Sequence, residues 1–262
     1  MPVLTDWIPR LRDALRPGAR AGSGAAPRTP EGLRLYAIGD VHGRKDLLDR
    51  LHDRIRADIA RHPDRTPVVI HLGDYVDRGP DSRGVVETLC GDPFPGVETL
   101  ALRGNHEDAM LAFLNDPIGA SAWLGFGGVQ TLTSYGVAVP ADPGPEALAA
   151  MSRALGAALP DTHRAFLRSL LDYAERGDYL FVHAGIRPGV PLERQDRADL
   201  MYIREPFLSH RRPLGHMVVH GHHVGDGPVV KSNRIGIDTG AFATGCLTGL
   251  VLDGAERAFL TT

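Results

Sequence analysis

The feature that most constrains this chain is the stretch I-H-L-G-D-Y-V-D-R-G at residues 70–79. Its apolar run ends at Gly73, and two carboxylates and an arginine follow at Asp74, Asp77 and Arg78. A short apolar run bounded by glycine predicts a buried β-strand. Because α/β proteins place their chemistry beyond the carboxyl ends of such strands, this strand should deliver those three side chains to a site.

The neighbouring sequence repeats the arrangement of a strand, a polar loop and a helix. A strand from Leu33 runs into G-D-V-H-G, and a strand over Val97–Arg103 runs into G-N-H-E. Leucines and isoleucines between residues 47 and 59 have the spacing of an amphipathic helix. The resulting order, β-α-β-α-β, predicts an α/β fold with largely parallel strands joined by helices.

The second half of the chain has a different character. Residues 115–176 combine a Gly-rich aromatic part with two apolar helical patterns, which predicts a small helical subdomain bordering the site. Y-L-F-V-H-A-G then predicts a strand ending at His183, and residues 217–219 lead into a histidine cluster at 220–223. The tail, R-I-G-I-D-T-G-A followed by C-L-T-G-L-V-L-D, is expected to form strands that close a second sheet.

Length and composition limit the possible classes of protein. The 262 residues suffice for one large α/β domain, which we expect over residues 32–262. A net charge of −3 implies no general affinity for nucleic acid. Only Cys90 and Cys246 are present, and the longest uncharged run, residues 117–141, is too rich in glycine for a membrane span. We therefore expect a cytoplasmic protein without stable membrane insertion.

Residues 1–31 form a separate region. Residues 1–16 place apolar side chains at helical spacing with arginines elsewhere on the surface, and residues 17–30 are rich in glycine and proline. The first part could be a basic amphipathic helix that touches a membrane or a partner, or a helix packed on the domain or frayed in solvent. The second part predicts a flexible linker.

Side chains that can bind metal ions recur at the predicted strand ends. Asp40 and His42 lie two residues apart on an extended stretch, so they project to the same side. Asp74 could bridge two ions, and Asn105, His183 and one histidine of the 220–223 cluster could complete the second ion. Each residue alone has an ordinary explanation as a turn, cap or core residue, but their recurrence at several strand ends indicates a site.

The ligand types and the charge of this site predict its chemistry. Oxygen and imidazole ligands together suit Mn, Fe or Zn better than Ca or Mg. Two divalent ions with Asp40, Asp74 and a bridging hydroxide leave about one positive charge, before Arg78 and Arg103 are added. Such a pocket favours a phosphate ester, and His106 is suited to protonate a leaving alkoxide if Asp77 orients it.

Four motifs carry a resemblance to a known family. G-D-V-H-G (39–43), G-D-Y-V-D-R-G (73–79), L-R-G-N-H-E (102–107) and H-A-G (183–185) resemble the signature of the phosphoprotein phosphatase family within the calcineurin-like metallophosphoesterases. M-Y-I-R-E (201–205) and I-D-T-G-A (237–241) resemble the bacterial and phage branch that includes bacteriophage lambda phosphatase. The similarity covers about residues 33–252.

The resemblance implies a fold and a set of roles. The fold would be a four-layer αββα sandwich of two mixed sheets flanked by helices, with two divalent ions, most readily Mn. The implied metal ligands are Asp40, His42, Asp74, Asn105, His183 and a later histidine. The implied catalytic pair is His106 with Asp77, and the implied phosphate-binding residues are Arg78, Arg103 and Arg204.

The choice of the later histidine rests on its neighbour. The family has a small residue just before this ligand, and in the cluster only His222 follows a glycine. His220 and His223 would then be neighbours, either near the substrate or on a polar rim. One departure from the family is Phe126-Gly127-Gly128, where relatives often have a polar residue before the glycines. Glu107 is expected to orient ligands from behind, and His71 to lie in the core.

Three functions remain open at the level of the sequence. The leading one is a metal-dependent serine/threonine protein phosphatase that hydrolyses phosphomonoesters by direct attack of a hydroxide bridging the two metal ions. The alternative is a hydrolase of dinucleoside polyphosphates, since a related branch uses similar motifs. A catalytically silent phosphoprotein-binding module ranks last, because Asp77, His106 and all the proposed ligands are intact. The substrate could therefore be a phosphorylated protein or a small phosphoester.

Overall fold

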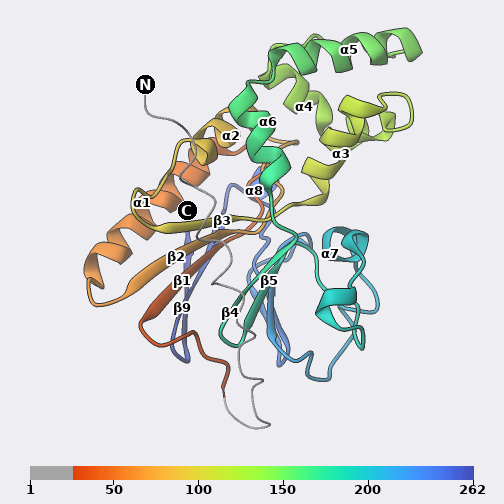
Figure 1. Ribbon diagram of the computed structural model, residues 1–262. Coiled ribbons are helices and arrows are strands. Elements are labelled where there is room, and N and C mark those ends of the chain that lie inside the picture. Colours follow the sequence, from red (N-terminus) through yellow and green to blue (C-terminus); the bar gives the residue numbers. More distant parts are fainter. Residues whose placement is uncertain (1–25) are drawn as a thin grey trace.

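The computed structural model describes residues 26–262, and Figure 1 shows two β-sheets face to face with helices outside them. This arrangement confirms the predicted α/β class with two mixed sheets flanked by helices. The predicted helix at residues 1–16 and most of the linker at 17–30 lie outside the described residues. Within 26–262, no helix is both long enough and apolar enough to cross a membrane.

The first sheet has the strand order β10-β9-β1-β2-β3. Its three parallel strands come from the predicted β-α-β-α-β unit, and its two remaining strands come from the end of the chain. The bounds are β1 (Leu33–Ile38), β2 (Thr66–His71), β3 (Glu98–Ala101), β9 (Thr248–Asp253) and β10 (Glu256–Thr261). The third strand is therefore shorter than the Val97–Arg103 predicted from the sequence.

The second sheet has the strand order β4-β5-β6-β8-β7, in which β5, β6 and β8 are parallel. The bounds are β4 (Tyr173–Arg176), β5 (Tyr179–Val182), β6 (Met217–His220), β7 (Val229–Val230) and β8 (Arg234–Gly236). Strand β9, from the C-L-T-G-L-V-L-D segment, does not belong to this sheet.

The placement of β9 corrects the prediction that both tail segments close the second sheet. β9 pairs antiparallel with β1 in the first sheet. Its Leu250 and Leu252 face the core between the sheets, whereas Val251 faces the helices. A strand that is apolar on both faces is suited to an interior position, and β9 fills such a position between β1 and β10.

Alternating side chains explain why the two sheets stack. Leu35 and Ala37 of β1 pack into the core shared by both sheets, whereas Tyr36 and Ile38 pack under the helices. The second sheet repeats the pattern, with Phe181 directed inward and its neighbours in β5 directed toward α7. Because successive strand residues point to opposite faces, the alternation produces four layers in the order helices, sheet, sheet, helix.

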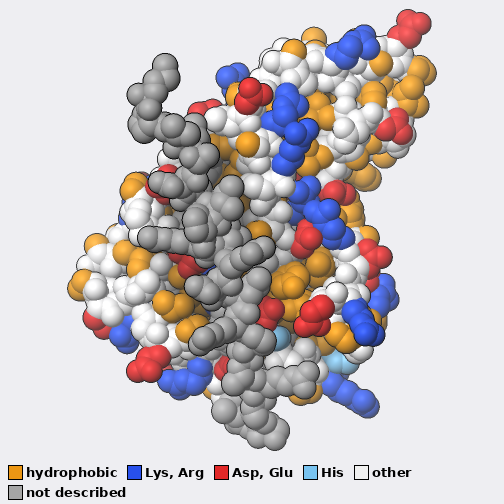
Figure 2. Space-filling view, viewed as in Figure 1, with side chains coloured by type: hydrophobic (Ala, Val, Ile, Leu, Met, Phe, Trp, Pro, Cys, Tyr) orange, Lys and Arg blue, Asp and Glu red, His pale blue; other side chains and the backbone are white. Residues whose placement is uncertain are grey.

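The helices lie mainly on the outer face of the first sheet and beyond one end of the sheets (Figure 1). Their bounds are α1 (Lys45–Arg61), α2 (Ser82–Cys90), α3 (Asn105–Asn115), η1 (Ser121–Phe126), α4 (Gly128–Ser134), α5 (Pro145–Ala158), α6 (Asp161–Ser169), η2 (Leu192–Arg194), α7 (Arg197–Tyr202) and α8 (Ala241–Thr244). Figure 2 shows Lys and Arg side chains over the region of α6 with Asp and Glu side chains beside them, as expected for a nearly neutral chain.

Candidate metal centre

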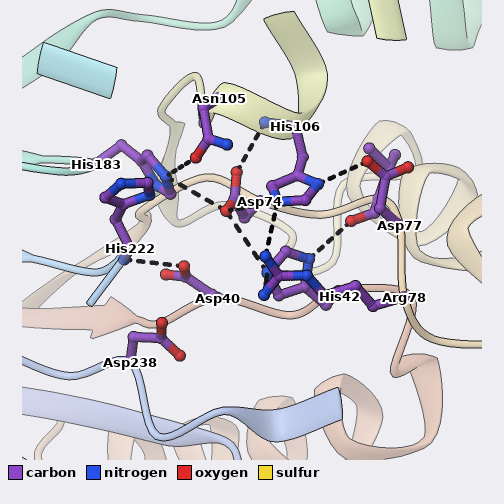
Figure 3. Close-up of polar contacts among 12 residues, drawn as sticks. Asp40, His42, Asp74, Asp77, Arg78, Asn105, His106, His183, His222 and Asp238 are labelled. Atoms are coloured by element: carbon purple, nitrogen blue, oxygen red, sulfur yellow. Dashed lines mark hydrogen bonds and ion pairs between the residues drawn. The ribbon is translucent and has the colours of Figure 1, made fainter. Parts of the chain in front are cut away.

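The candidate ligands come together beyond the carboxyl ends of the parallel strands. In the first sheet, Asp40 follows β1, Asp74 follows β2, and Asn105 begins α3 after β3. In the second sheet, His183 follows β5 directly and His222 follows β6. Figure 3 shows that these side chains gather around Asp74. Face-to-face stacking of the sheets thus joins two sets of strand ends into one site.

The Asp74 carboxylate lies at the centre of this group. Its Oδ2 is 3.4 Å from His183 Nε2 and 3.5 Å from His42 Nε2. Its Oδ1 accepts a hydrogen bond of 3.1 Å from the backbone N–H of His106. Two groups have ligand atoms within 4.8 Å of one another, namely His42, Asp74 and His106, and Asp74, His183 and His222. Asp74 belongs to both groups, as a bridging carboxylate must.

Backbone carbonyls fix the orientation of two of the histidines. His183 Nδ1 is 2.9 Å from the carbonyl oxygen of Leu72, and His42 Nδ1 is 2.9 Å from that of Val76. Because a carbonyl oxygen only accepts, each Nδ1 is the donor and each Nε2 is left for the site. Metal-binding histidines use this type of support.

Burial and neighbouring charges shift the pKa values of the histidines in the site in different directions. Burial lowers the pKa of His42 to about 3 and that of His222 to about 2, so both rings are neutral, as ligands must be. Burial acts in the same direction on His183, but the charges of Asp74, Asp40 and Glu107 outweigh it and raise the pKa of His183 to about 10. The pocket therefore favours a positive charge next to Asp74, where a cation would lie.

Asp40 and Asp238 add two more buried carboxylates. Asp40 Oδ2 accepts a hydrogen bond of 2.9 Å from the backbone N–H of His222, while Oδ1 is buried without a partner. Burial, and then the charge of Asp238, raise the pKa of Asp40. An unpartnered buried carboxylate oxygen is costly unless something else binds it, and a metal ion would satisfy it. Asp40 is nevertheless in neither of the two compact groups.

Asp238 is a site residue that the sequence reasoning did not single out. It follows β8, another parallel strand, and it is only 3% exposed. Figure 3 places it beside Asp40, and its Oδ1 accepts a hydrogen bond from the backbone N–H of Gly240. The sequence did contain a signal for Asp238, namely a carboxylate that follows a short apolar strand. The negative charge of Asp238 was not included in the charge of the site that we estimated from the sequence.

Backbone strain is concentrated at the site. Among the described residues, six non-glycine residues have a positive φ, and one of them, Asp92, lies outside the predicted site. The other five are His42 (46°), Asp74 (52°), Asp77 (74°), Arg78 (68°) and His222 (62°). Such conformations cost of order 1–3 kcal/mol each and persist where the surrounding structure enforces them. Their concentration here marks the site independently of its side-chain chemistry.

Glu107 provides much of this enforcement. Its carboxylate is fully buried and accepts hydrogen bonds from the backbone N–H groups of Asp74 (2.9 Å), Tyr75 (2.7 Å), Val76 (3.2 Å) and Gly104 (3.0 Å). A Cβ atom on Gly104 would lie 2.1 Å from Asp74 Oδ1, so only glycine fits there. Glu107 thus supports the loop that carries Asp74 from behind, as predicted.

A second set of contacts joins His106, Asp77 and Arg78. His106 Nδ1 is 2.6 Å from Asp77 Oδ2, and its Nε2 is 3.8 Å from Asp74 Oδ2. Burial alone would lower the pKa of His106, but Asp74 and the hydrogen bond to Asp77 raise it. Guanidinium nitrogens of Arg78 lie 3.1 Å from Nε2 of both His42 and His106. A proton donor and a fixed cation therefore border the carboxylate cluster.

The other predicted phosphate-binding arginines are placed differently. Arg103 is 8% exposed, and its guanidinium donates to the carbonyl oxygen of Arg168 while Nε has no partner. Arg204 is exposed and lies close enough for its charge to lower the pKa of His222, after the larger effect of burial. The contacts thus join Arg78 directly to the cluster, and Arg204 acts on it through its charge.

The structure also shows where the other histidines lie. β6 ends at His220, so His222 lies in the following loop and strand alternation does not apply to it. His222 is nevertheless the member of the 220–223 cluster that groups with Asp74 and His183. His220 is 3% exposed and packs against Phe207, so the expectation of a polar rim is wrong for it. His71 is fully buried, as predicted.

Comparisons with known proteins agree with this geometry. The sequence model of the calcineurin-like phosphoesterase family matches residues 33–235. The chain is 34% identical over 95 residues to serine/threonine-protein phosphatase 2 of Escherichia coli, which covers 36% of this chain and 38% of that protein. It is 26% identical over 243 residues to an asymmetrical bis(5'-nucleosyl)-tetraphosphatase of Bacillus cereus, which covers 81% of this chain and 88% of that protein.

The lengths of the matches and the structural comparison define what is shared. The chain spans 26% and 38% of the lengths of the curated relatives that it matches over 80 and 95 residues. A crystal structure of a protein provisionally named a diadenosine tetraphosphatase superposes with a TM-score of 0.62 and 21% identity, over 90% of this chain and 98% of that chain. At that identity the superposition establishes a common fold.

Proposed function

This chain belongs to the calcineurin-like phosphoesterase family, a family of metal-dependent hydrolases, and on that premise we propose that it is a serine/threonine protein phosphatase acting on phosphomonoesters. The observation that carries the proposal is the pair formed by His106 and Asp77, whose Nδ1–Oδ2 distance is 2.6 Å. An alkoxide is a poor leaving group that needs a proton, whereas a nucleotide phosphate leaves more readily without one. A buried, oriented proton donor is therefore most useful for esters of alcohols.

The proposal assigns the metal ions to the residues around Asp74. Asp40, His42 and Asp74 would hold one ion, and Asp74, Asn105, His183 and His222 would hold the other. Bound divalent ions would lower the pKa of a water molecule and polarise the phosphoryl group. Manganese is the preferred candidate, with iron or zinc as alternatives, because the ligand set mixes carboxylate and amide oxygens with imidazole nitrogens.

The remaining proposed roles concern binding of the phosphate and departure of the alcohol. Arg78, Arg103 and Arg204 would bind phosphate oxygens, and the direct contacts of Arg78 with His42 and His106 give it the strongest support. His106 would give the Nε2 proton to the leaving oxygen while Nδ1 stays hydrogen-bonded to Asp77. Water would attack phosphorus directly, so no phosphorylated enzyme would form.

The proposal also includes the branch of the family and the location of the protein. M-Y-I-R-E and I-D-T-G-A support the bacterial and phage branch that includes lambda phosphatase. The free thiols of Cys90 and Cys246 are compatible with a reducing compartment, which supports a cytoplasmic location.

A second candidate function is hydrolysis of dinucleoside polyphosphates. Phe242 is 36% exposed next to the site, with the Arg78 guanidinium 4.7 Å from its ring centroid and the His42 ring 5.4 Å away. Tyr202 is 44% exposed, and its hydroxyl donates to the carbonyl oxygen of Asn105 at 3.4 Å. Phe126 is 58% exposed and precedes Gly127, whose carbonyl oxygen accepts a hydrogen bond from the Arg78 N–H. Exposed aromatic rings beside a phosphate site could stack on a nucleobase.

The two functions separate in one experiment. The purified chain is assayed with a phosphoserine peptide and with diadenosine tetraphosphate, each in the presence of Mn, Fe, Zn or Mg. We expect kcat/KM to be at least about tenfold higher for the peptide, since each 1.4 kcal/mol of transition-state preference is tenfold in rate. A higher kcat/KM for diadenosine tetraphosphate would favour the second function instead.

A further inference from the structure

The helical segment between α3 and α5 reaches into the site at one place. Trp123 of η1 and Thr131 of α4 are 1% and 0% exposed. Both side chains end at the Asp77 carboxylate, which is itself fully buried. The sequence predicted only that this segment borders the site, but the segment contacts the pair of Asp77 and His106 directly through Asp77.

The contacts with Asp77 are short and directional. The Trp123 indole donates to Asp77 Oδ2 at 2.8 Å, and the Thr131 hydroxyl donates to Oδ1 at 2.6 Å. Oδ2 is also the atom 2.6 Å from His106 Nδ1. The carboxylate therefore accepts from three side chains of three different elements, which leaves it no freedom to rotate away from His106.

The backbone of Asp77 is held by the same groups. Its N–H donates to Thr131 Oγ1 at 2.8 Å and to Ser82 Oγ at 3.0 Å, and the two hydroxyl oxygens are 2.9 Å apart. With the Thr131 proton directed to Asp77 Oδ1, the Ser82 proton is free to donate to Thr131 Oγ1. This closed network also stabilises the strained φ of 74° at Asp77.

The Gly127-Gly128 pair brings the segment close enough for these bonds. A Cβ atom on Gly128 would lie 2.5 Å from Cδ2 of the Trp123 indole, and one on Gly127 would lie 2.6 Å from the Arg78 nitrogen. Gly127 also has a φ of 109° and accepts a hydrogen bond from the Arg78 N–H. Both glycines are therefore required for Trp123 to reach Asp77.

We propose that Trp123 and Thr131 are positioning residues of the proton donor, which hold the Asp77 carboxylate so that His106 Nε2 is aimed at the leaving oxygen. The proposal rests on the phosphomonoesterase function proposed above. In the step concerned, the P–O bond to the alcohol breaks and its electron pair stays on the leaving oxygen. That oxygen takes the proton from His106 Nε2, while the oxygen of the attacking water forms the new P–O bond. One proton of this water stays on the phosphate, and the other is released to solvent, from which His106 is reprotonated. Trp123 and Thr131 would act through Asp77, because both side chains are buried and end at its carboxylate.

The test is a series of leaving groups. Trp123→Phe removes the one hydrogen bond of the indole to Asp77 Oδ2, and Thr131→Val removes the hydroxyl together with its contacts to Asp77 Oδ1, the Asp77 N–H and Ser82 Oγ. Both changes keep the approximate shape of the side chain, and Thr131→Ser keeps the hydroxyl. Their kcat values are measured with p-nitrophenyl phosphate, whose phenolate leaves without help, with phenyl phosphate, and with a phosphoserine peptide. We expect kcat to fall about 10- to 100-fold for the peptide and less than about threefold for p-nitrophenyl phosphate, as for loss of a residue that orients an active group.

A matched control comes from the same segment. Tyr135→Phe removes a buried hydrogen bond of 2.9 Å to His163 that does not involve Asp77. It should leave the ratio of the kcat values for the two substrates unchanged, and Thr131→Ser should preserve the wild-type ratio. This ratio does not depend on the fraction of enzyme that is folded, so a partly unfolded variant still gives a decisive result.

The outcomes separate this inference from the function on which it rests. If His106→Asn selectively slows the peptide but Trp123→Phe and Thr131→Val slow all substrates equally or none, the positioning role is wrong and the proposed function stands. If His106→Asn itself shows no dependence on the leaving group, the proton-donor role fails and the inference fails with it. Unchanged metal content by elemental analysis confirms that the variants do not act through the ions.

Discussion

The described part of the chain holds two groups of buried histidines, one around Asp74 and one formed by His52 of α1 and His71 of β2. In the second group, the two Nε2 atoms are 3.0 Å apart, and both Nδ1 atoms lack a partner. Among the described residues, no carboxylate forms an ion pair with either of these rings. Burial lowers the pKa of His52 to about 2 and that of His71 to about 4.

The contrast shows that burial of histidines does not by itself make a site. Around Asp74, Nδ1 atoms are fixed by carbonyls, Nε2 atoms face carboxylates, and the backbone is strained at five positions. The His52–His71 pair has none of these features and packs against Phe94 in the core. We conclude that carboxylates and imposed geometry distinguish the reactive group from the structural one.

The largest effect is expected for Asp74→Asn. This change removes the one charge that both ligand groups share, so metal content should fall below one ion per chain and activity should be lost. Elemental analysis measures the metal and phosphatase assays measure the activity. His71→Gln in the other group should retain the full metal content, and two ions retained by Asp74→Asn would contradict bridging.

His106→Asn should come next, with turnover of a phosphoserine peptide falling about 10²- to 10⁴-fold, the usual size of a general-acid effect. Metal content should not change, because the proposed ligands remain. Steady-state kinetics with elemental analysis checks both expectations. Normal turnover by this variant would exclude His106 as the proton donor.

The His52–His71 pair should act on stability instead. Both histidines titrate near 6.5 when unfolded and far lower when folded, so below pH 6.5 the unfolded state binds more protons. The contribution of the two histidines to the free energy of unfolding should be fully present above pH 6.5. It should fall as the pH drops toward 4, by on the order of 3 kcal/mol for His71. Urea unfolding at several pH values measures this fall.

A matched variant tests whether the pair is the cause of that pH dependence. The double change of His52→Leu and His71→Val should make the pH dependence between pH 6.5 and 4 less steep, with the remaining slope due to other buried histidines such as His42 and His222, while activity at pH 7.5 stays within about twofold of wild type. An equally steep loss of stability in the double variant would show that other groups cause it.

The smallest effect is expected at the edge of the reactive group. Arg204→Ala should weaken inhibition by free phosphate about three- to tenfold, in keeping with an exposed charge. Arg212→Ala is the control, because Arg212 is also exposed but its backbone carbonyl accepts a hydrogen bond from Asn233 at the amino end of β8, away from the site. Equal inhibition constants for the two variants would remove Arg204 from phosphate binding.

Much of the site could be predicted because its signals are local. Asp40, Asp74 and His183 each stand at the end of a short apolar strand, and such ends meet along one edge of a sheet. The prediction failed where the signal was not local. The C-L-T-G-L-V-L-D segment has the sequence pattern of a strand, but this pattern does not say to which sheet the strand belongs. Pairing with β1 makes it part of the first sheet.

The sequence by itself determined which side chains are available and that several of them lie at strand ends, because residue type and strand periodicity are properties of adjacent residues. The tertiary structure alone decided that Asp238 joins the carboxylates and that Asp77 is held by Trp123 and Thr131, which lie 46 and 54 residues further along the chain. Contacts over such separations depend on how the elements pack, and packing is decided by the whole buried surface at once.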